Sequence, residues 1–509
     1  LISMLDAPVR WMPDQQHLLV HAVPEGRGPE PAAPVTPAGP VVEQGDGDTP
    51  RSTYESRNLL ETAHDDALFD HHATSQLMIV DPKKGTRTRL GEPAPFYDTS
   101  PSPDGSYLLV ERLVGPWSHA VRYNRFAREI EVWDRSGEVV ATVASLPLAD
   151  EVPIQGVPEG PRGVGWQATA DHTLFWAEAL DGGDPMAEAA HRDRLMRLDA
   201  PFTGEPTEVW KATHRLRGWG GWLEDGETLM VTESERMRRW RYTHLLDVNT
   251  GEATAWYDLN EKDRYGSPGA PMLRVLPNGE AVLRQAGDAV YFRGVGGTDQ
   301  GDRPFLDLRP LDGGPAERLF RADPDRYERF IAFGPKDGEL IIRSESPTEV
   351  PNYLLATLGD RVRAPAGEPT RAHTRQPITS FTDPTPQLRQ IDKRIVQYER
   401  ADGVPLSFQL YLPPGYEEGD VLPAVLYAYP LEYSDAATAG QVSGSTQTFE
   451  RFRGASHLFF LLQGYAVLDR TAMPMVGDPE TVYDTFVEQL VADADAAMEA
   501  IEGLEMIDP

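Results

Sequence analysis

Four arginines lie within residues 235–242 and form the densest basic cluster of the chain: Arg236, Arg238, Arg239 and Arg241. Guanidinium groups bind carboxylates through two parallel hydrogen bonds, so this cluster could bind an acidic ligand. In a strand, side-chain alternation would place Arg239 and Arg241 on one face and leave Arg236 and Arg238 nearer the turn. The alternative is a solvated strand face whose arginines pair with Glu233 and Glu235.

No serine lies in a Gly-x-Ser-x-Gly sequence, which presents the nucleophile of α/β-hydrolases on a tight turn between a strand and a helix. The nearest candidate, at 440–444, has a different spacing and no preceding strand.

The absence of cysteine excludes disulfides, thiolate zinc sites and cysteine nucleophiles. His71 and His72 are adjacent and would not share a helix face, as paired metal ligands would. We therefore expect no metal and no cofactor.

The charge of the chain limits its partners. The 509 residues carry a formal net charge of −32, which argues against nucleic acid, because phosphate binding needs a basic face. No run approaches the roughly 18–20 apolar residues of a membrane span, so we expect a soluble protein without a membrane partner.

The chain begins at Leu1 and ends at Pro509 after a helical pattern, which suggests a fragment. A signal peptide therefore cannot be judged, and cytoplasm and periplasm both stay open, as does the oligomeric state.

Residues 1–360 contain two kinds of turn sequence in alternation. The first precedes an apolar run and occurs at 13–14, 103–105, 171–172, 225–226, 277–279 and 336–338. The second follows an alternating run and occurs at 81–85, 134–137, 199–204, 247–251 and 311–314. Asp-Gly and Asn-Gly supply the positive φ of hairpin turns, so each turn marks a pair of antiparallel strands.

These hairpins recur with a long period. From residue 104 onward the Asp or Asn of the first turn returns every 53 to 67 residues, and a second turn falls inside each interval. Two hairpins per period are four strands, which make one blade of a β-propeller. We therefore predict an all-β propeller over residues 1–360, with six blades counted directly and seven expected. An array of β-sandwiches is the alternative.

Three segments depart from the blade pattern. Residues 24–52 are rich in Pro and Gly and predict an extended surface insertion. Residues 56–69 have apolar residues at helical spacing and predict a short helix. Residues 361–389 are dense in Pro, Thr and Arg, as expected of a linker.

Residues 390–509 predict a second domain of the α/β type. Two alternating segments, 395–400 and 406–412, flank a turn at 401–403 and predict a hairpin. Residues 422–429 are an almost unbroken apolar and aromatic run, which predicts a strand buried on both faces. Residues 481–504 have the longest helical pattern. Its predicted apolar side includes Val487, Val491 and Met498, and Asp493 falls on the opposite, acidic side.

Three stretches resemble the prolyl oligopeptidase family of serine peptidases, and more closely its glutamyl endopeptidase branch. Residues 51–77 follow a proline-rich segment, as in that branch. Residues 412–445 carry Tyr429-Pro430-Leu431-Glu432 in place of the glycine-rich turn of the wider family, and 472–501 are similar to the helix that precedes the serine. In this family a β-propeller precedes an α/β-hydrolase domain. The resemblance therefore implies that residues 390–509 are the N-terminal part of such a domain.

The resemblance implies a serine peptidase that cleaves peptides or unfolded proteins after Glu. A serine hydroxyl would attack the peptide carbonyl, a histidine would move the proton and an aspartate would orient the histidine. Because the family order is Ser, Asp, His, all three are expected beyond Pro509, and this chain alone is expected to be inactive. Tyr429 matches the tyrosine that donates to the oxyanion in the wider family. Tyr427 is the competing candidate, and a core tyrosine is the alternative.

The same resemblance gives the arginine cluster a role in binding the substrate glutamate, with Arg451, Arg453 and His457 as a second choice. Two other functions remain open. The propeller could be a binding or scaffold module whose α/β part has no enzymatic role, or the chain could belong to an exopeptidase or esterase with another specificity.

Overall fold

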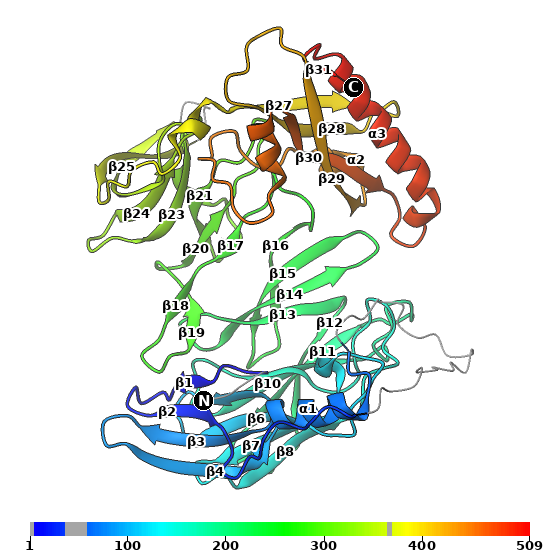
Figure 1. Cartoon of the computed structure of the whole chain (residues 1–509). Helices are drawn as coiled ribbons and strands as arrows, with labels where there is room; N and C mark the ends of the chain where they lie inside the picture. The colour runs from blue at the N-terminus through cyan, green and yellow to red at the C-terminus, as the bar shows by residue number, and fades with distance from the viewer. Residues whose placement is uncertain (1–4, 36–58, 364–368, 509) are drawn as a thin grey trace. The chain divides into compact units, whose positions relative to one another are not determined.

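The computed structural model describes residues 5–35, 59–363 and 369–508 (Figure 1). The chain divides into two compact units, here called unit 1 and unit 2. Unit 1 comprises Leu1–Glu233, His244–Thr254 and Leu273–Leu283, and unit 2 comprises Ser234–Thr243, Ala255–Met272 and Arg284–Pro509. No helix within the described ranges is long and apolar enough to cross a membrane.

Unit 1 contains three four-stranded antiparallel sheets in which consecutive strands are neighbours. The first sheet has the strands β1 (Val9–Trp11), β2 (Leu18–Ala22), β3 (Ser75–Asp81) and β4 (Thr86–Ala94). The second has β5 (Phe96–Pro101), β6 (Tyr107–Leu113), β7 (Arg128–Asp134) and β8 (Val139–Leu146). The third has β9 (Arg162–Trp166), β10 (Thr173–Ala179), β11 (Asp193–Asp199) and β12 (Thr207–Ala212).

Apolar side chains pack successive sheets against one another. Leu19 and Leu77 of the first sheet share one buried cluster with Leu108 and Trp133 of the second. Burial of such side chains supplies the main driving force for this stacking. These four-stranded meanders have the strand order of propeller blades, as the hairpin pattern predicted.

The next sheets follow the same order with one exception. The fourth contains β13 (Arg215–Trp222), β14 (Thr228–Glu235), β15 (Trp240–Asp247) and β16 (Ala253–Asn260). The fifth contains β17 (Ala270–Pro271), β20 (Ala289–Gly294), β21 (Phe305–Pro310) and β22 (Glu317–Arg321), while β18 (Leu273–Val275) and β19 (Ala281–Leu283) pair separately. The sixth contains β23 (Tyr327–Phe333), β24 (Glu339–Glu345), β25 (Asn352–Arg363) and β26 (Pro369–Pro377).

The described ranges thus contain six four-stranded sheets of this kind and one separate pair, whereas the number of propeller blades stays a prediction. Within residues 361–389, which were expected to be a linker, β26 pairs with β25, so the sixth sheet extends to Pro377. The division of the chain into domains remains a prediction.

Aspartates at the predicted turns close the hairpins. Asp81 Oδ1 accepts hydrogen bonds from the backbone N–H groups of Lys83 and Lys84 at 2.9 and 3.0 Å, and Gly85 ends the turn at φ 73°. A side chain would be strained at that φ, whereas glycine adopts it readily. The same Asp-centred bonding recurs at Asp225 and Asp247, which explains why the turn sequences located the strands.

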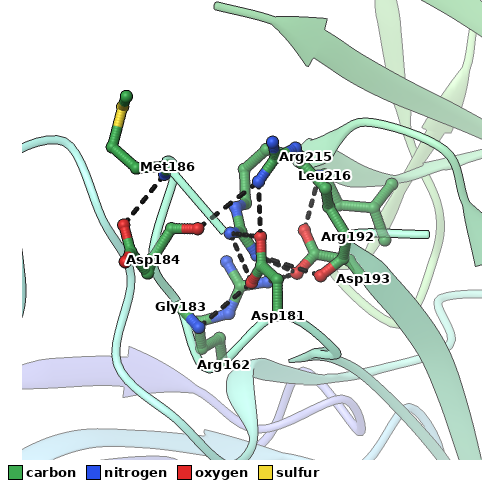
Figure 2. A network of polar contacts seen from close by, with 9 residues as sticks. All are labelled: Arg162, Asp181, Gly183, Asp184, Met186, Arg192, Asp193, Arg215 and Leu216. Atoms are coloured by element: carbon green, nitrogen blue, oxygen red, sulfur yellow. Dashed lines mark hydrogen bonds and ion pairs between the residues drawn. The ribbon is translucent and has the colours of Figure 1, made fainter. Parts of the chain in front are cut away.

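A buried polar network ties the third sheet to the start of β13, as Figure 2 shows. Arg215 on β13 donates to Asp193 at 2.6 Å and to Asp181 at 2.6 and 2.7 Å. Arg162 also binds Asp193, at 2.6 Å, and Arg192 binds Asp181 at 2.8 Å. Buried charges are tolerable only when they are paired and hydrogen-bonded in this way.

Helix α1 (Ala63–Ala73) corrects the helix predicted over 56–69. Thr62 caps it: the Thr62 hydroxyl accepts from the Asp65 N–H at 3.2 Å, and the Asp65 carboxylate accepts from the Thr62 N–H at 2.8 Å. This reciprocal cap fixes the helix start at Ala63, so the predicted start was wrong. Residues 56–58, and the expected insertion from residue 36 to 52, lie outside the described residues.

The C-terminal part of unit 2 is a five-stranded sheet in the order β27-β28-β30-β29-β31. Strands β27 (Asp392–Glu399) and β28 (Pro405–Leu412) form the predicted hairpin, and β29 (Leu422–Tyr433) runs parallel to β30 (Ala466–Val476). β31 (Ile507–Asp508) pairs with the start of β29. The connecting elements are the helix α2 (Ala436–Ala439) and three 3-10 helices, η2 (Pro386–Gln390), η3 (His457–Gln463) and η4 (Val482–Thr485). A 3-10 helix, η1 (Tyr123–Arg125), lies in unit 1.

Strand β29 is not buried on both faces, contrary to the prediction. Leu426, Tyr427, Tyr429 and Leu431 are all exposed. Among the described residues, β31 pairs only with Leu422 and Pro423, so most of β29 has a paired neighbour on one side. The apolar run therefore identified a strand of the sheet but not its degree of burial.

Helix α3 (Phe486–Glu502) confirms the predicted C-terminal helix but only part of its predicted apolar side. Asp493 is fully buried, whereas Val487 and Val491 are exposed. Asp493 Oδ1 accepts a hydrogen bond from Arg400 at 2.8 Å, and this buried partner explains how an acidic residue can face the sheet. Ala496, Ala497 and Ile501 complete the buried side of α3.

Candidate functional site

Tyr429 lies on the parallel part of the sheet in unit 2, opposite Ala472 of β30. Its side chain is among the most exposed aromatic groups, with a relative exposure of 74%. Within the described ranges its hydroxyl forms no hydrogen bond. A phenol in this state can donate a hydrogen bond to an incoming group without first losing a protein partner.

Tyr427, the competing candidate, is engaged elsewhere. Its ring stacks on His457 with the ring centroids 4.2 Å apart and an interplanar angle of 12°. His457 in turn bonds to Asp469 of β30, with 2.9 Å between Nε2 and Oδ1. The Tyr427 ring is thus held on the imidazole, so the structure separates the two tyrosines by their surroundings. It also gives His457, a second-choice substrate residue, an acidic partner of its own.

The arginine cluster spans the turn between β14 and β15. Three of the four arginines, Arg236, Arg238 and Arg239, precede β15, and only Arg241 lies within it. Arg239 has a left-handed backbone with φ 50°, and its carbonyl accepts a hydrogen bond from the Glu261 N–H at 2.7 Å. The backbone of this turn is therefore held in place by the end of β16.

Three of the four arginines have acidic partners. Arg236 binds Glu480, Arg239 binds Glu432, and Arg238 binds Glu235 at 3.4 Å. Arg238 also lies over the Trp240 ring and donates to the Tyr242 hydroxyl at 3.0 Å. The expected pairing with Glu235 is therefore present at Arg238. Glu233 binds His244 instead, at 2.8 Å.

Arg241 differs from the other three. No ion pair or hydrogen bond of its side chain occurs in the described part of the chain, and its Nε is buried without a partner. An arginine whose charge is not neutralised attracts an anion more strongly than a paired one. Arg241 is thus the member of the cluster with the most unused binding capacity.

Glu432 connects the arginine cluster to the tyrosines. One of its carboxylate oxygens accepts from Arg239 Nη2 and the other accepts from the Tyr483 hydroxyl of η4. Partial burial opposes ionisation, but the bonds from Tyr483 and Arg239 and the charges of Arg239 and Lys262 outweigh it and lower the pKa of Glu432. Glu432 is therefore an ionised carboxylate at neutral pH.

Tyr429 is a neighbour of this cluster. The hydrogen bond to Glu432 is the largest cause that raises the pKa of Tyr483, followed by burial and by the Glu432 charge, and Tyr429 adds to the rise. Tyr429 also lies on β29, three residues before Glu432, which binds Arg239. The two sets of residues that the sequence singled out, the arginine cluster and Tyr429, are thus brought together through Glu432 and Tyr483.

Further contacts hold the end of β29 to residues 255–272. Asn260 donates to the Ser434 hydroxyl and to the Asp435 carboxylate, both at 3.0 Å. Asp435 also caps α2 by accepting from the Thr438 N–H at 2.8 Å. The Gln441 side chain accepts from the Arg264 N–H at 2.6 Å. These bonds fix the position of Glu432 relative to the arginine cluster within unit 2.

The partners Glu432, Glu480 and Tyr483 were not identified as site residues from the sequence. Glu432 lies near the end of the largely apolar strand β29. An isolated acidic residue in an apolar strand indicates that a basic partner lies nearby in the fold. Its partner Arg239 lies 193 residues away along the chain, so no local pattern could have revealed the pair. Arg451 and Arg453, the other second-choice residues, are exposed in the loop before η3.

Comparison with known proteins finds two plant relatives. The chain is 34% identical over 515 residues to a protein of Arabidopsis thaliana named "Probable glutamyl endopeptidase, chloroplastic". The matched region covers 96% of this chain and 52% of that protein. It is 32% identical over 507 residues to a protein of the same name from Oryza sativa subsp. japonica, covering 95% and 53%. The chain thus spans about half the length of these relatives.

Comparison with solved structures finds an acylaminoacyl peptidase of Pyrococcus horikoshii. The match covers 99% of this chain and 64% of that chain, with a TM-score of 0.47 and 12% sequence identity. No protein-family model matches the sequence.

Proposed function

We propose that the chain, which is similar to two proteins named glutamyl endopeptidase, belongs to the glutamyl endopeptidase branch of the prolyl oligopeptidase family and is part of a serine peptidase that cleaves after glutamate. Its substrates are peptides or unfolded proteins. The proposal assigns substrate binding and part of the transition-state stabilisation to residues of unit 2.

One observation carries the proposal. Tyr429, whose hydroxyl is unbonded within the described ranges, lies on the same strand as Glu432, which binds the arginine cluster through Arg239, and one member of that cluster, Arg241, is unpaired. A peptidase that cuts after glutamate needs both parts: a donor for the developing oxyanion and a cation for the side-chain carboxylate. In a chain with a net charge of −32, a basic cluster beside such a donor is a specific feature.

The reaction is an acyl transfer in two stages. A serine oxygen attacks the backbone carbonyl carbon of the glutamate residue and loses its proton to a histidine. The C–N bond to the next residue then breaks as the histidine passes this proton to the departing amine. Water then attacks the acyl-enzyme in the same manner and releases the new carboxyl end. In both stages Tyr429 donates a hydrogen bond to the oxyanion, while Arg239 or Arg241 binds the glutamate side chain.

The nucleophile is not assigned to any residue of this chain. No Gly-x-Ser-x-Gly sequence occurs in the 509 residues. We accordingly propose that the chain alone does not hydrolyse peptides and that the serine, aspartate and histidine are supplied outside it.

The test uses the protein encoded by the complete reading frame. Peptides that differ only in the residue before the cut, with Glu, Asp, Pro or Ala, would be compared by kcat/KM, and an active-site serine would be titrated with a fluorophosphonate. We expect fluorophosphonate labelling and a preference for Glu. Labelling with equal cleavage of all four peptides would refute the glutamyl specificity, and no labelling would favour the binding or scaffold function.

A further inference from the structure

The Arg239 guanidinium is already neutralised in this structure. Glu432 accepts from its Nη2, and the carboxylate is held ionised by this bond and by Tyr483. Both side chains are shielded from water, with relative exposures of 19% for Arg239 and 26% for Glu432. A guanidinium in this state presents little net charge to a second carboxylate.

The geometry of Arg239 also limits how a ligand can bind it. Its Nε is buried and has no hydrogen-bond partner among the described residues. A carboxylate can therefore form two hydrogen bonds only with the terminal nitrogens, and two-point binding is what gives arginine its preference for carboxylates. Glu432 holds one of these nitrogens, Nη2. A substrate glutamate that binds Arg239 in two-point fashion must therefore share Nη2 with Glu432, and the two carboxylates repel each other there.

Glu432 can leave Arg239 without losing all of its stabilisation. Its second oxygen is bonded to the Tyr483 hydroxyl, and the charge of Lys262 also favours its ionised form. Tyr483 itself is exposed and can move with the carboxylate. The backbone of Arg239 is fixed by Glu261 and by the turn bond to the Arg236 carbonyl, so the arginine would stay in position.

We propose that Glu432 is an internal ligand of Arg239, which the side-chain carboxylate of an acidic substrate displaces. This inference rests on the proposed function. This displacement makes Glu432 a residue that affects specificity. A substrate with a glutamine or apolar side chain has no charge, so it cannot displace Glu432 from Arg239. The exchange lowers the affinity for acidic side chains, because Glu432 must first leave Arg239, and it leaves neutral side chains unaffected, because they do not bind Arg239.

The experiment measures binding of two blocked peptides to the chain by calorimetry. The peptides are N-acetyl-Ala-Glu-amide and N-acetyl-Ala-Gln-amide. Glu432→Gln removes the competing charge and keeps an oxygen acceptor. This variant should bind the Glu peptide about fivefold more tightly than the unsubstituted chain does, because loss of one competing ion pair has an effect of about this size. The Gln peptide should bind unchanged. Adding Arg239→Ala to Glu432→Gln should abolish the gain.

Glu480→Gln is the matched control, because Glu480 pairs with the neighbouring Arg236 in the same way. It should leave the affinity for both peptides unchanged. Glu432→Asp withdraws the charge by one methylene and should give a smaller gain, which keeps the inference testable if Glu432→Gln does not fold.

Two results would overturn the inference, and they differ in what else they imply. If Glu432→Gln binds the Glu peptide as before or more weakly, while Arg239→Ala still reduces binding, then Glu432 positions Arg239 and the proposed function stands. If no variant distinguishes the Glu peptide from the Gln peptide, the acidic specificity itself is wrong and the inference fails with it.

Discussion

The guanidinium of Arg215 and the carboxylate of Asp193 lie 2.6 Å apart, and their side chains have relative exposures of only 6% and 0%. Arg215 reaches Asp181 as well, and the second oxygen of Asp193 accepts from the Leu216 N–H at 2.6 Å (Figure 2). Each buried charge thus has several partners. Such a network adds little net stability compared with apolar residues, but losing one member leaves the remaining charges with fewer partners in a dry site.

Replacing Arg215 with alanine should therefore destabilise unit 1 strongly. Two buried carboxylates would lose their main cation, which typically costs about 3–5 kcal/mol. Thermal unfolding followed by circular dichroism would measure the loss. Arg217→Ala is the matched control, since Arg217 lies on the same strand but is exposed, and its effect should stay within about 0.5 kcal/mol. Equal effects of the two substitutions would contradict a special role for Arg215.

Turn chemistry made most of the strand order predictable. Asp81 and Gly85 act within a few residues of each other, so their effect can be seen in the sequence alone. The pairing of β27 with β28 was predictable for the same reason, because only a short turn separates them. In both cases the interacting residues are close in the sequence, so the sequence pattern predicts the turn.

The orientation of α3 and the core of the site depend on distant residues. Asp493 faces the sheet because Arg400, 93 residues earlier, supplies its partner, and helical periodicity alone assigns an aspartate to the solvent side. Arg239 and Glu432 are likewise joined only in the folded chain. The sequence could identify the arginines and Tyr429 as candidates, but it could not show which arginines are already neutralised.

Asp493 should make stability depend on pH. Burial raises its pKa to about 6, although Arg400 acts in the opposite direction. An aspartate in the unfolded chain titrates near 3.9, so the folded state binds more protons between the two values and loses stability as the pH rises through about 6. Relative to Asp493→Asn, the free energy of unfolding of the unsubstituted chain should fall by on the order of 2 kcal/mol between pH 4.5 and 7.5.

Unfolding midpoints of both proteins across that pH range would measure this difference. The comparison with Asp493→Asn is needed because the other acidic residues titrate in both proteins alike. Parallel stability curves would show that Asp493 does not titrate in this range.

Tyr429→Phe should slow catalysis without affecting folding. Loss of one oxyanion donor typically lowers kcat by about 10²–10³-fold. Stability should be nearly unchanged, because the hydroxyl has no partner within the described ranges and the ring is exposed. The measurement is kcat of the protein encoded by the complete reading frame, together with its unfolding midpoint.

Tyr427→Phe is the control for that experiment. It keeps the ring that stacks on His457, so kcat should change little. If Tyr427→Phe lowers kcat and Tyr429→Phe does not, the donor has been assigned to the wrong tyrosine.

Arg239→Ala should reduce cleavage after Glu more than cleavage after any neutral residue. Its guanidinium binds Glu432, which also binds Tyr483, whereas Arg238 lies over the Trp240 ring and its side chain is 59% exposed. Removal of a charge-assisted hydrogen bond to the substrate typically costs about 1.5–3 kcal/mol, or roughly 10- to 150-fold in kcat/KM. Arg238→Ala should leave the ratio of Glu to Gln cleavage unchanged. Both variants need a measured unfolding midpoint, which separates a loss of stability from a loss of binding. If kcat/KM falls equally for Glu and Gln peptides, the substitution has acted through the fold of the β14–β15 turn. A fall confined to Glu peptides assigns Arg239 to the recognition of the substrate carboxylate.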